Sequence, residues 1–228
     1  MKLLAIETST EACSAALYLD GELNERYESV PQMHAQLILP MVDALMSEAD
    51  ISVTQLDVLA FGRGPGSFTG LRIAAGVAQG IAFGADIPVT PVSSLAALAQ
   101  GIYRERCTPH VLVAADARMS EVYWGIYQAD ENGIMRLHGL EQVSKPDFVD
   151  LPPDHHNNWF GAGSGWGVSA ASLQHRLASK ISAYDADCLP HAQDIALLGV
   201  DAFDRGCRVH AHEAIPVYLR DDVAKKQF

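Results

Sequence analysis

A regular series of glycines inside a predicted helix constrains this chain more than any other feature. Residues 62–72 read GRGPGSFTGLR, and helix-like sequence follows as far as Asp86, with Ser67 in position to cap its start. Gly76, Gly80 and Gly84 recur four residues apart, and each interior glycine costs about 1 kcal/mol relative to alanine. Small residues at this spacing let another backbone approach closely. We therefore predict a contact helix, either against another chain or pressed on a sheet of its own domain.

The charge of the chain excludes one class of function. The 228 residues carry a formal net charge of −12 with only 16 Lys and Arg, whereas direct nucleic-acid binding requires a basic surface. The four cysteines are far apart in sequence and form no C-x-x-C pair, which disfavours a zinc site or a disulfide framework. The apolar run at 73–85 is shorter than the ~20 residues of a membrane span. With no signal-peptide core at the start, we expect a cytoplasmic protein with no membrane contact.

The hydrophobic patterns predict two successive units of similar order. For the first unit we expect strands at 3–6, 13–19 and 22–27, a helix at 34–49 interrupted by Pro40, a strand at 56–61, the glycine-rich helix, a strand at 88–92 and a helix at 95–103. For the second we expect strands at 111–115, 121–128 and 134–143, a short helix at 145–150, a strand at 158–162, a helix at 169–180, a strand at 181–184 and a helix at 192–203. The tail from Arg220 is expected to be mobile.

This order resembles the actin, hexokinase and Hsp70 superfamily. Within it, several phrases resemble the TsaB (YeaZ) family: IETST with CSAAL at 6–17, HAQL and LP at 34–40, GPGSFTGLR at 64–72, DAR with EVY at 116–123, and PVYLR at 216–220. The resemblance implies an α/β fold of two tandem actin/hexokinase-like (ribonuclease H-like) lobes, residues 1–104 and 105–228. Each lobe is expected to be a mixed sheet that opens with a three-stranded antiparallel meander and is flanked by helices, the last helix and tail packing back on the first lobe.

The resemblance also implies a function and its partners. It implies a non-catalytic scaffold that binds and supports a TsaD-type transferase, which forms N6-threonylcarbamoyladenosine at position 37 of tRNAs reading ANN codons. It further implies a homodimer when the chain is alone, a TsaE-type ATPase in the full complex, and contact with tRNA only through that complex. The interface that it implies comprises His34, Leu37, Ile38, Met41, Leu45, Phe68, Leu71, Arg72, Ala75, Gly76 and Gly80. We expect Leu37, Met41, Leu45, Leu71 and Val77 to face outward together as an apolar patch.

The two turns that would hold ATP in this superfamily are poorly suited to phosphate. Neither the first turn, residues 7–10, nor the second turn, residues 116–120, contains a glycine whose backbone would let an anion approach. In the glycine loop, Leu71 stands where a P-loop would need lysine. We therefore expect no cofactor. The alternative is an autonomous ATP-dependent small-molecule kinase or carbamoyl transferase, which titration of the isolated chain with ATP and magnesium would distinguish.

Metal and nucleophile motifs are equally weak. His34 has Ile38, not a second histidine, four residues on, and the pairs at 155–156 and at His210 and His212 lie in polar loop-like sequence. Ser164 stands in a G-S-G triplet and not in the G-x-S-x-G elbow of a hydrolase, so a peptidase is a weaker third option. We expect neither a metal site nor a catalytic residue.

Overall fold

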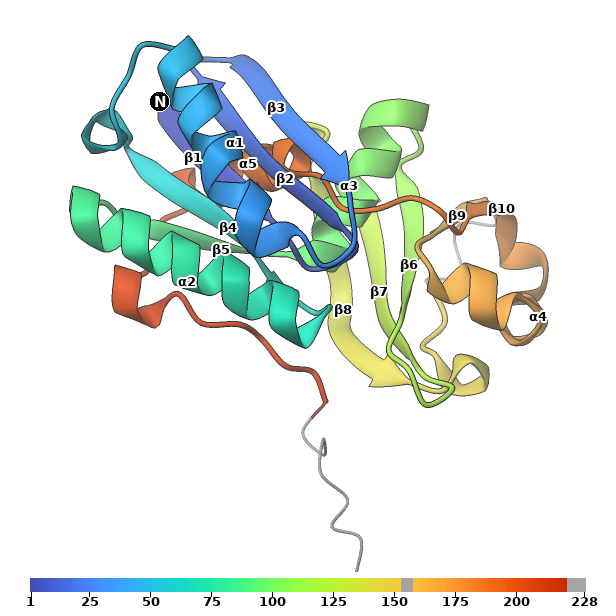
Figure 1. Ribbon diagram of the computed structural model, residues 1–228. Helices are drawn as coiled ribbons and strands as arrows, with labels where there is room; N and C mark the ends of the chain where they lie inside the picture. Colours follow the sequence, from blue (N-terminus) through green and yellow to red (C-terminus); the bar gives the residue numbers. More distant parts are fainter. Residues whose placement is uncertain (153–157, 221–228) are drawn as a thin grey trace, which may run out of the picture.

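The computed structural model describes residues 1–152 and 158–220, which form two five-stranded sheets side by side (Figure 1). The first sheet has the order β3-β2-β1-β4-β5, from β1 (Lys2–Glu7), β2 (Ala12–Leu19), β3 (Glu22–Ser29), β4 (Val58–Gly64) and β5 (Val89–Ser93). The second has the order β10-β9-β6-β7-β8, from β6 (His110–Asp116), β7 (Val122–Ala129), β8 (Met135–Ser144), β9 (Trp159–Ala162) and β10 (Ile181–Asp185).

The two sheets repeat one topology. In each, the first three strands form an antiparallel meander and the last two strands run parallel to the first. Leu4 pairs with Leu17 on one side and with Leu59 on the other, and Leu112 has the same central place in the second sheet. The structure thus confirms the predicted α/β fold of two lobes, each a mixed sheet that opens with a three-stranded antiparallel meander.

Helices cover both faces of the first sheet. α1 (His34–Glu48) and α2 (Phe68–Ala85) lie on one face, and α5 (Ala192–Asp204) lies on the other (Figure 1). Because successive strand residues point to opposite faces, Leu4 and Ile6 join the core beneath α1 and α2, whereas Leu3 and Ala5 join the core beneath α5. The central strand is therefore buried from Leu3 to Glu7.

The second sheet is covered in the same way by α3 (Ser94–Arg106) and α4 (Gly165–Leu177). Val111 and Val113 pack with α3, and Leu112 and Ala114 pack with Trp166 of α4. α3 follows the first sheet in the chain but packs on the second, and α5 follows the second but packs on the first. This exchange of helices ties the two lobes together.

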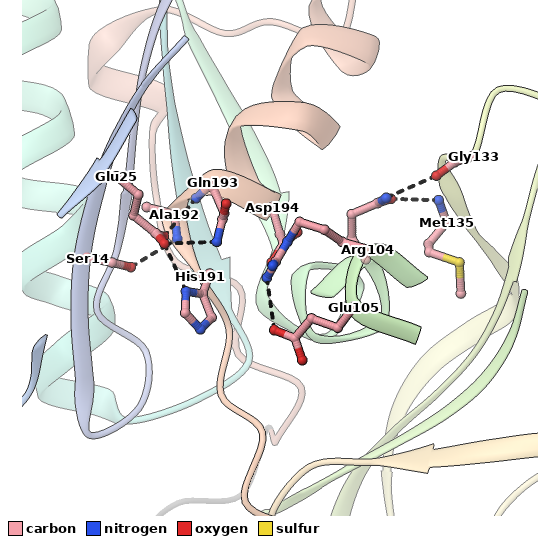
Figure 2. A network of polar contacts seen from close by, with 11 residues as sticks. Ser14, Glu25, Arg104, Glu105, Gly133, Met135, His191, Ala192, Gln193 and Asp194 are labelled. Atoms are coloured by element: carbon pink, nitrogen blue, oxygen red, sulfur yellow. Dashed lines mark hydrogen bonds and ion pairs between the residues drawn. The ribbon is translucent and has the colours of Figure 1, made fainter. Parts of the chain in front are cut away.

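Polar contacts fix the start of α5 on the first sheet (Figure 2). Glu25 of β3 accepts hydrogen bonds from the backbone N–H of Gln193 at 3.1 Å and from its side-chain Nε2 at 2.9 Å, and it lies 3.0 Å from Nδ1 of His191. The Ser14 hydroxyl accepts from the N–H of Ala192 at 2.9 Å. The first turn of a helix has unpaired N–H groups and attracts negative charge, so these side chains cap α5 from another element.

Several predicted elements differ in detail. α1 starts at His34 as predicted, but it continues through Pro40 without interruption. α4 starts at Gly165 and not at Ser169, where the backbone instead leaves the helical region. The predicted helix at 145–150 is a single 3-10 turn. The short helices are η1 (Val53–Gln55), η2 (Pro146–Phe148), η3 (Ala178–Lys180) and η4 (Ala211–Glu213). No helix in the ranges 1–152 and 158–220 is long and apolar enough to cross a bilayer.

The close fit of α5 on the first sheet generates a stability prediction. A Cβ atom at Gly199 would lie 2.8 Å from the Cβ of Ala60 and 3.3 Å from a methyl of Leu3. Gly199→Val should therefore lower the free energy of unfolding by about 1–3 kcal/mol through overpacking. Urea unfolding checks this, with Ala202→Val on the half-buried side of the same helix as the control. Equal stability of Gly199→Val and the native chain would show that α5 does not seat tightly on the sheet.

Candidate docking surface

The outer face of α2 exposes its backbone at three glycines. Arg72, Gly76, Gly80, Phe83 and Gly84 follow one another at helical spacing and are all exposed, and we call this set the glycine face. A Cβ atom added at Gly76, Gly80 or Gly84 would meet no other atom within 4 Å. Phe83 is 84% exposed, although its ring is large and apolar. Nothing within the described chain therefore requires glycine at these positions.

The inner face of α2 is packed on the first sheet. Ala74, Ala75, Ala78 and Ala82 are each at most 4% exposed and belong to the core shared with α1. Leu71, on the same face of the helix, is 1% exposed. Alanines on this face let the helix lie close to the strands. The sequence prediction of an internal contact therefore holds for this face, while the glycines lie on the opposite one.

Most of the predicted interface residues on α1 also face the core. Ile38, Met41 and Leu45 are at most 6% exposed, and Leu37 is partly buried against the same cluster. The His34 ring is buried too, and its Nε2 lies 2.8 Å from the carbonyl oxygen of Thr10. The expectation that Met41, Leu45 and Leu71 face outward is therefore wrong, because the apolar stripe of each helix covers the sheet.

Leu39 and Phe83 are exposed on these helices and are absent from the sequence prediction. Leu39 is 52% exposed on α1. It lines a groove of about 770 Å³ with Met46, Val53 and Ile81, so the groove lies between α1, η1 and α2. Phe83 follows Gly76 and Gly80 at helical spacing, and this spacing was the signal that could have found it.

Phe68 lies at the start of the same helix. It is 51% exposed, and the Arg72 guanidinium lies 3.6 Å above its ring, as in a cation–π contact. Tyr218 packs against the ring at a centroid distance of 5.8 Å. Phe68, Arg72, Gly76 and Gly80 are thus exposed at the surface, and their place in a partner interface stays a prediction.

The glycine loop before α2 lies directly against the first turn. A Cβ atom at Gly66 would lie 2.4 Å from the carbonyl oxygen of Ser9, and one at Gly70 would lie 1.9 Å from that of Thr8. The N–H of Ser67 donates to the Ser9 carbonyl at 2.7 Å, and the Thr8 hydroxyl donates to the Gly70 carbonyl at 2.8 Å. These glycines let two backbones meet, and the loop sets the position of α2.

A cleft of about 940 Å³ separates the lobes. Its walls include Ser9 and Phe68 from the first lobe and Ala117 and Arg118 from the second turn. The second turn is closed on itself, because the Asp116 carboxylate accepts from the N–H of Arg118 at 2.8 Å.

The weaker candidate sites find little support in the geometry. The Ser164 hydroxyl accepts a hydrogen bond from the N–H of Asp116 at 3.0 Å, and burial raises the pKa of Cys188 to about 12. Within residues 1–152 and 158–220, no three His, Cys, Asp or Glu side chains are grouped to hold a metal ion. His210 and His212 stack on each other at 5.9 Å, and the pair at 155–156 lies outside the described residues.

Glu7 is the buried carboxyl of the first turn. Its side chain is fully buried, accepts from the N–H of Ser9, and accepts from the Ser94 hydroxyl at 2.9 Å. Burial raises the pKa of this carboxyl above its ordinary value of 4.5. The folded chain therefore holds the proton more tightly than the unfolded chain does.

This shift predicts a pH dependence. The contribution of Glu7 to stability is complete below pH 4.5 and is lost as the pH rises through its higher folded pKa. Glu7→Gln cannot ionise, so its stability relative to the native chain should increase between acidic and mildly alkaline pH. Urea unfolding of both proteins across that range measures the effect. Parallel stability curves would contradict a buried, pKa-shifted carboxyl.

The two classes of glycine in α2 predict opposite effects of one substitution. Gly76→Ala and Gly80→Ala should each raise the free energy of unfolding of the monomer by about 0.5–1 kcal/mol, because the added methyl enters open space. Gly70→Ala, the matched control, should lower it by about 1 kcal/mol or more, because its Cβ would collide with Thr8. Denaturant unfolding, at protein concentrations where the chain is monomeric, measures these changes in the free energy of unfolding. Destabilisation by Gly76→Ala would show that this face packs within the chain.

The chain is similar in sequence to a known family model and to several known proteins. A family model described as TsaD, tRNA N6-adenosine threonylcarbamoyltransferase, matches residues 28–228. The tRNA threonylcarbamoyladenosine biosynthesis protein TsaB of Escherichia coli K12 is 44% identical, with 100% of this chain and 98% of that protein covered. The protein of the same name from Haemophilus influenzae is 37% identical, with 100% and 97% covered.

A solved structure extends this likeness to three dimensions. YeaZ from Pseudomonas aeruginosa is 50% identical and superposes with a TM-score of 0.89, covering 96% of this chain and 99% of that one. Full-length identity of this order, together with the matching fold, shows that this chain belongs to the TsaB (YeaZ) family of tRNA threonylcarbamoyladenosine biosynthesis proteins.

Proposed function

We propose that this chain is a cytoplasmic, non-catalytic scaffold subunit in the synthesis of N6-threonylcarbamoyladenosine at position 37 of tRNAs reading ANN codons. In this proposal it binds and supports a TsaD-type transferase, a TsaE-type ATPase joins the full complex, and tRNA is met only through that complex. The observation that carries the proposal is the glycine face of α2, where the helix leaves backbone exposed beside Phe83 and close to Leu39.

The energetics of the glycine face support a partner. Alanine would stabilise the exposed interior of a helix by about 1 kcal/mol per residue, so glycine there has a cost for the isolated chain. A neighbouring helix offsets this cost if it lies closer than side chains would permit. Exposed Phe68, Leu39 and Phe83 supply the apolar area that such a contact would cover.

The fold expected of the partner supports docking at the same surface. A family model of the transferase matches residues 28–228 of this chain, so the two proteins share a fold over that range. Related chains can pair through equivalent surfaces about an approximate two-fold axis, and the chain alone can form a true two-fold dimer in the same way. The proposed contact comprises the glycine face with Leu37, Leu39 and Phe68. His34, Ile38, Met41, Leu45, Leu71 and Ala75 support this surface from beneath.

A non-catalytic role accords with the turns that face the cleft. The Thr8 hydroxyl and the N–H of Ser67 are already hydrogen-bonded within the chain, and the Asp116 carboxylate is bonded to its own turn. A ligand phosphate that used these groups would have to displace these bonds. No specific observation in the structure favours the alternative of an autonomous kinase.

Leucine on the glycine face tests the proposal. Gly76→Leu and Gly80→Leu should fold, because the space beside both positions is open, but should weaken binding to the TsaD-type protein at least about tenfold by holding the two backbones apart. Calorimetric titration of the purified chains measures the affinity. Ala171→Leu, at an exposed position of α4 on the other lobe, is the matched control and should bind normally.

Circular dichroism and gel filtration complete the test. Both leucine variants should keep the helical spectrum of the native chain and lose its dimer peak. Native affinity of both variants for the transferase would overturn the assignment of the surface, and unfolding of both would show that the glycine face is internal.

A further inference from the structure

The chain after α5 returns along the first lobe as a segment, residues 209–220, that is irregular apart from the short helix η4, and we call this segment the strap (Figure 1). It starts at the edge of the first sheet, where Val209 and Val89 of β5 exchange two backbone hydrogen bonds of 2.8 and 2.9 Å. The side chain of Ala214 is fully buried, and its carbonyl accepts from Nε2 of Gln79 on α2 at 3.0 Å. The first half of the strap is thus fixed to the first lobe.

The second half of the strap follows α2 to its N-terminal end. The N–H of Val217 donates to the carbonyl of Arg63 at 2.8 Å. Gly64 permits this approach, because a Cβ there would lie 3.1 Å from the Val217 carbonyl oxygen. Tyr218 then packs against Phe68, which is itself part of the cleft wall. The strap therefore reaches the cleft from the side of the first lobe.

Arg220 connects the strap to the other lobe. The sequence predicts a mobile tail from this residue onward, but Arg220 itself makes fixed contacts. Residues 221–228 lie outside the described chain. Its guanidinium Nη2 lies 2.5 Å from the Glu121 carboxylate and donates to the carbonyl of Ala117 at 2.9 Å. The Arg220 side chain is only 15% exposed. Hydrogen bonds between charged, partly buried groups are stronger than those at an open surface.

The turn that Arg220 holds has an unusual backbone. Arg118, Met119 and Ser120 all have positive φ, between 55° and 64°, which side-chain-bearing residues rarely adopt. Such a conformation persists when surrounding contacts fix it. Arg220 supplies such contacts from beneath, at the carbonyl of Ala117 and at the side chains of Glu121 and Met119.

The two attachment points of the strap lie on opposite walls of one cleft. Phe68 lines the cleft from the first lobe, and Ala117 and Arg118 line it from the second. α3 and α5 join the lobes through separate contacts, such as the paired hydrogen bonds of 3.0 Å between Arg104 and Asp194. We infer that the strap is a latch that sets the width of the interlobe cleft, with Arg220 and Glu121 as its closure. This inference does not depend on the proposed docking of a partner.

Double electron–electron resonance, which measures the distance between two spin labels across the cleft, tests the latch. Spin labels placed by Thr69→Cys and Val168→Cys stand at exposed positions on the two walls, with Cys107→Ser and Cys207→Ser to remove the exposed native thiols. The labelled chain is diluted with unlabelled protein so that only distances within one chain contribute. Arg220→Ala should shift the mean distance by more than about 2 Å or broaden its distribution correspondingly.

Two further variants keep the test decisive. Glu121→Gln approaches the same contact from the second lobe and should produce a change of the same direction, while the double variant should add little to either. Arg208→Ala removes an exposed arginine that contacts Phe203 and not the second lobe, and should leave the distribution unchanged. Distributions of Arg220→Ala and Glu121→Gln that coincide with that of the parent would overturn the latch.

Discussion

The different packing of the two faces of α2 is the constraint on which the rest of this structure depends. One face must lie close enough to the first sheet to fill the core, and the alanines at 74, 75, 78 and 82 achieve this contact. The other face leaves Gly76 and Gly80 with open space where a side chain would stabilise the helix. An isolated chain gains nothing from that choice, whereas a chain that receives a second helix there gains close contact. This difference is the physical basis of the proposed scaffold role.

The position of α2 depends on a chain of close contacts that begins at the first turn. Glycines at 66 and 70 let the loop meet the carbonyls of Ser9 and Thr8, so the loop that resembles a phosphate site is occupied by the turn itself. The strap then contacts α2 at Gln79 and the end of β4 at Arg63. The loop and the first turn at the edge of the cleft thus fix the position of α2.

The sequence predicts the repeat of two lobes well because its strand and helix periods are local. The sequence does not predict which way a helix face points or which residues far apart in the chain make contact. The apolar stripe of Met41, Leu45 and Leu71 is visible from spacing, but spacing does not say whether the stripe faces the sheet or a partner, and the structure shows that it faces the sheet. No local pattern near Ala192 indicates that α5 crosses to the first lobe, although the family resemblance implies this packing and the structure shows it. The partners of Arg220 lie about a hundred residues away, at Ala117 and Glu121, and no local pattern reports them.

Radical footprinting of the complex with a TsaD-type protein tests the central claim most directly. Phe83 on the glycine face is 84% exposed in the free chain, and Phe148 on the second lobe is 73% exposed and serves as the internal reference. The account predicts that Phe83 is strongly protected from oxidation in the isolated complex while Phe148 reacts at its free rate. A complex that forms with Phe83 fully reactive would contradict it, because the bare face of α2 would then have no partner.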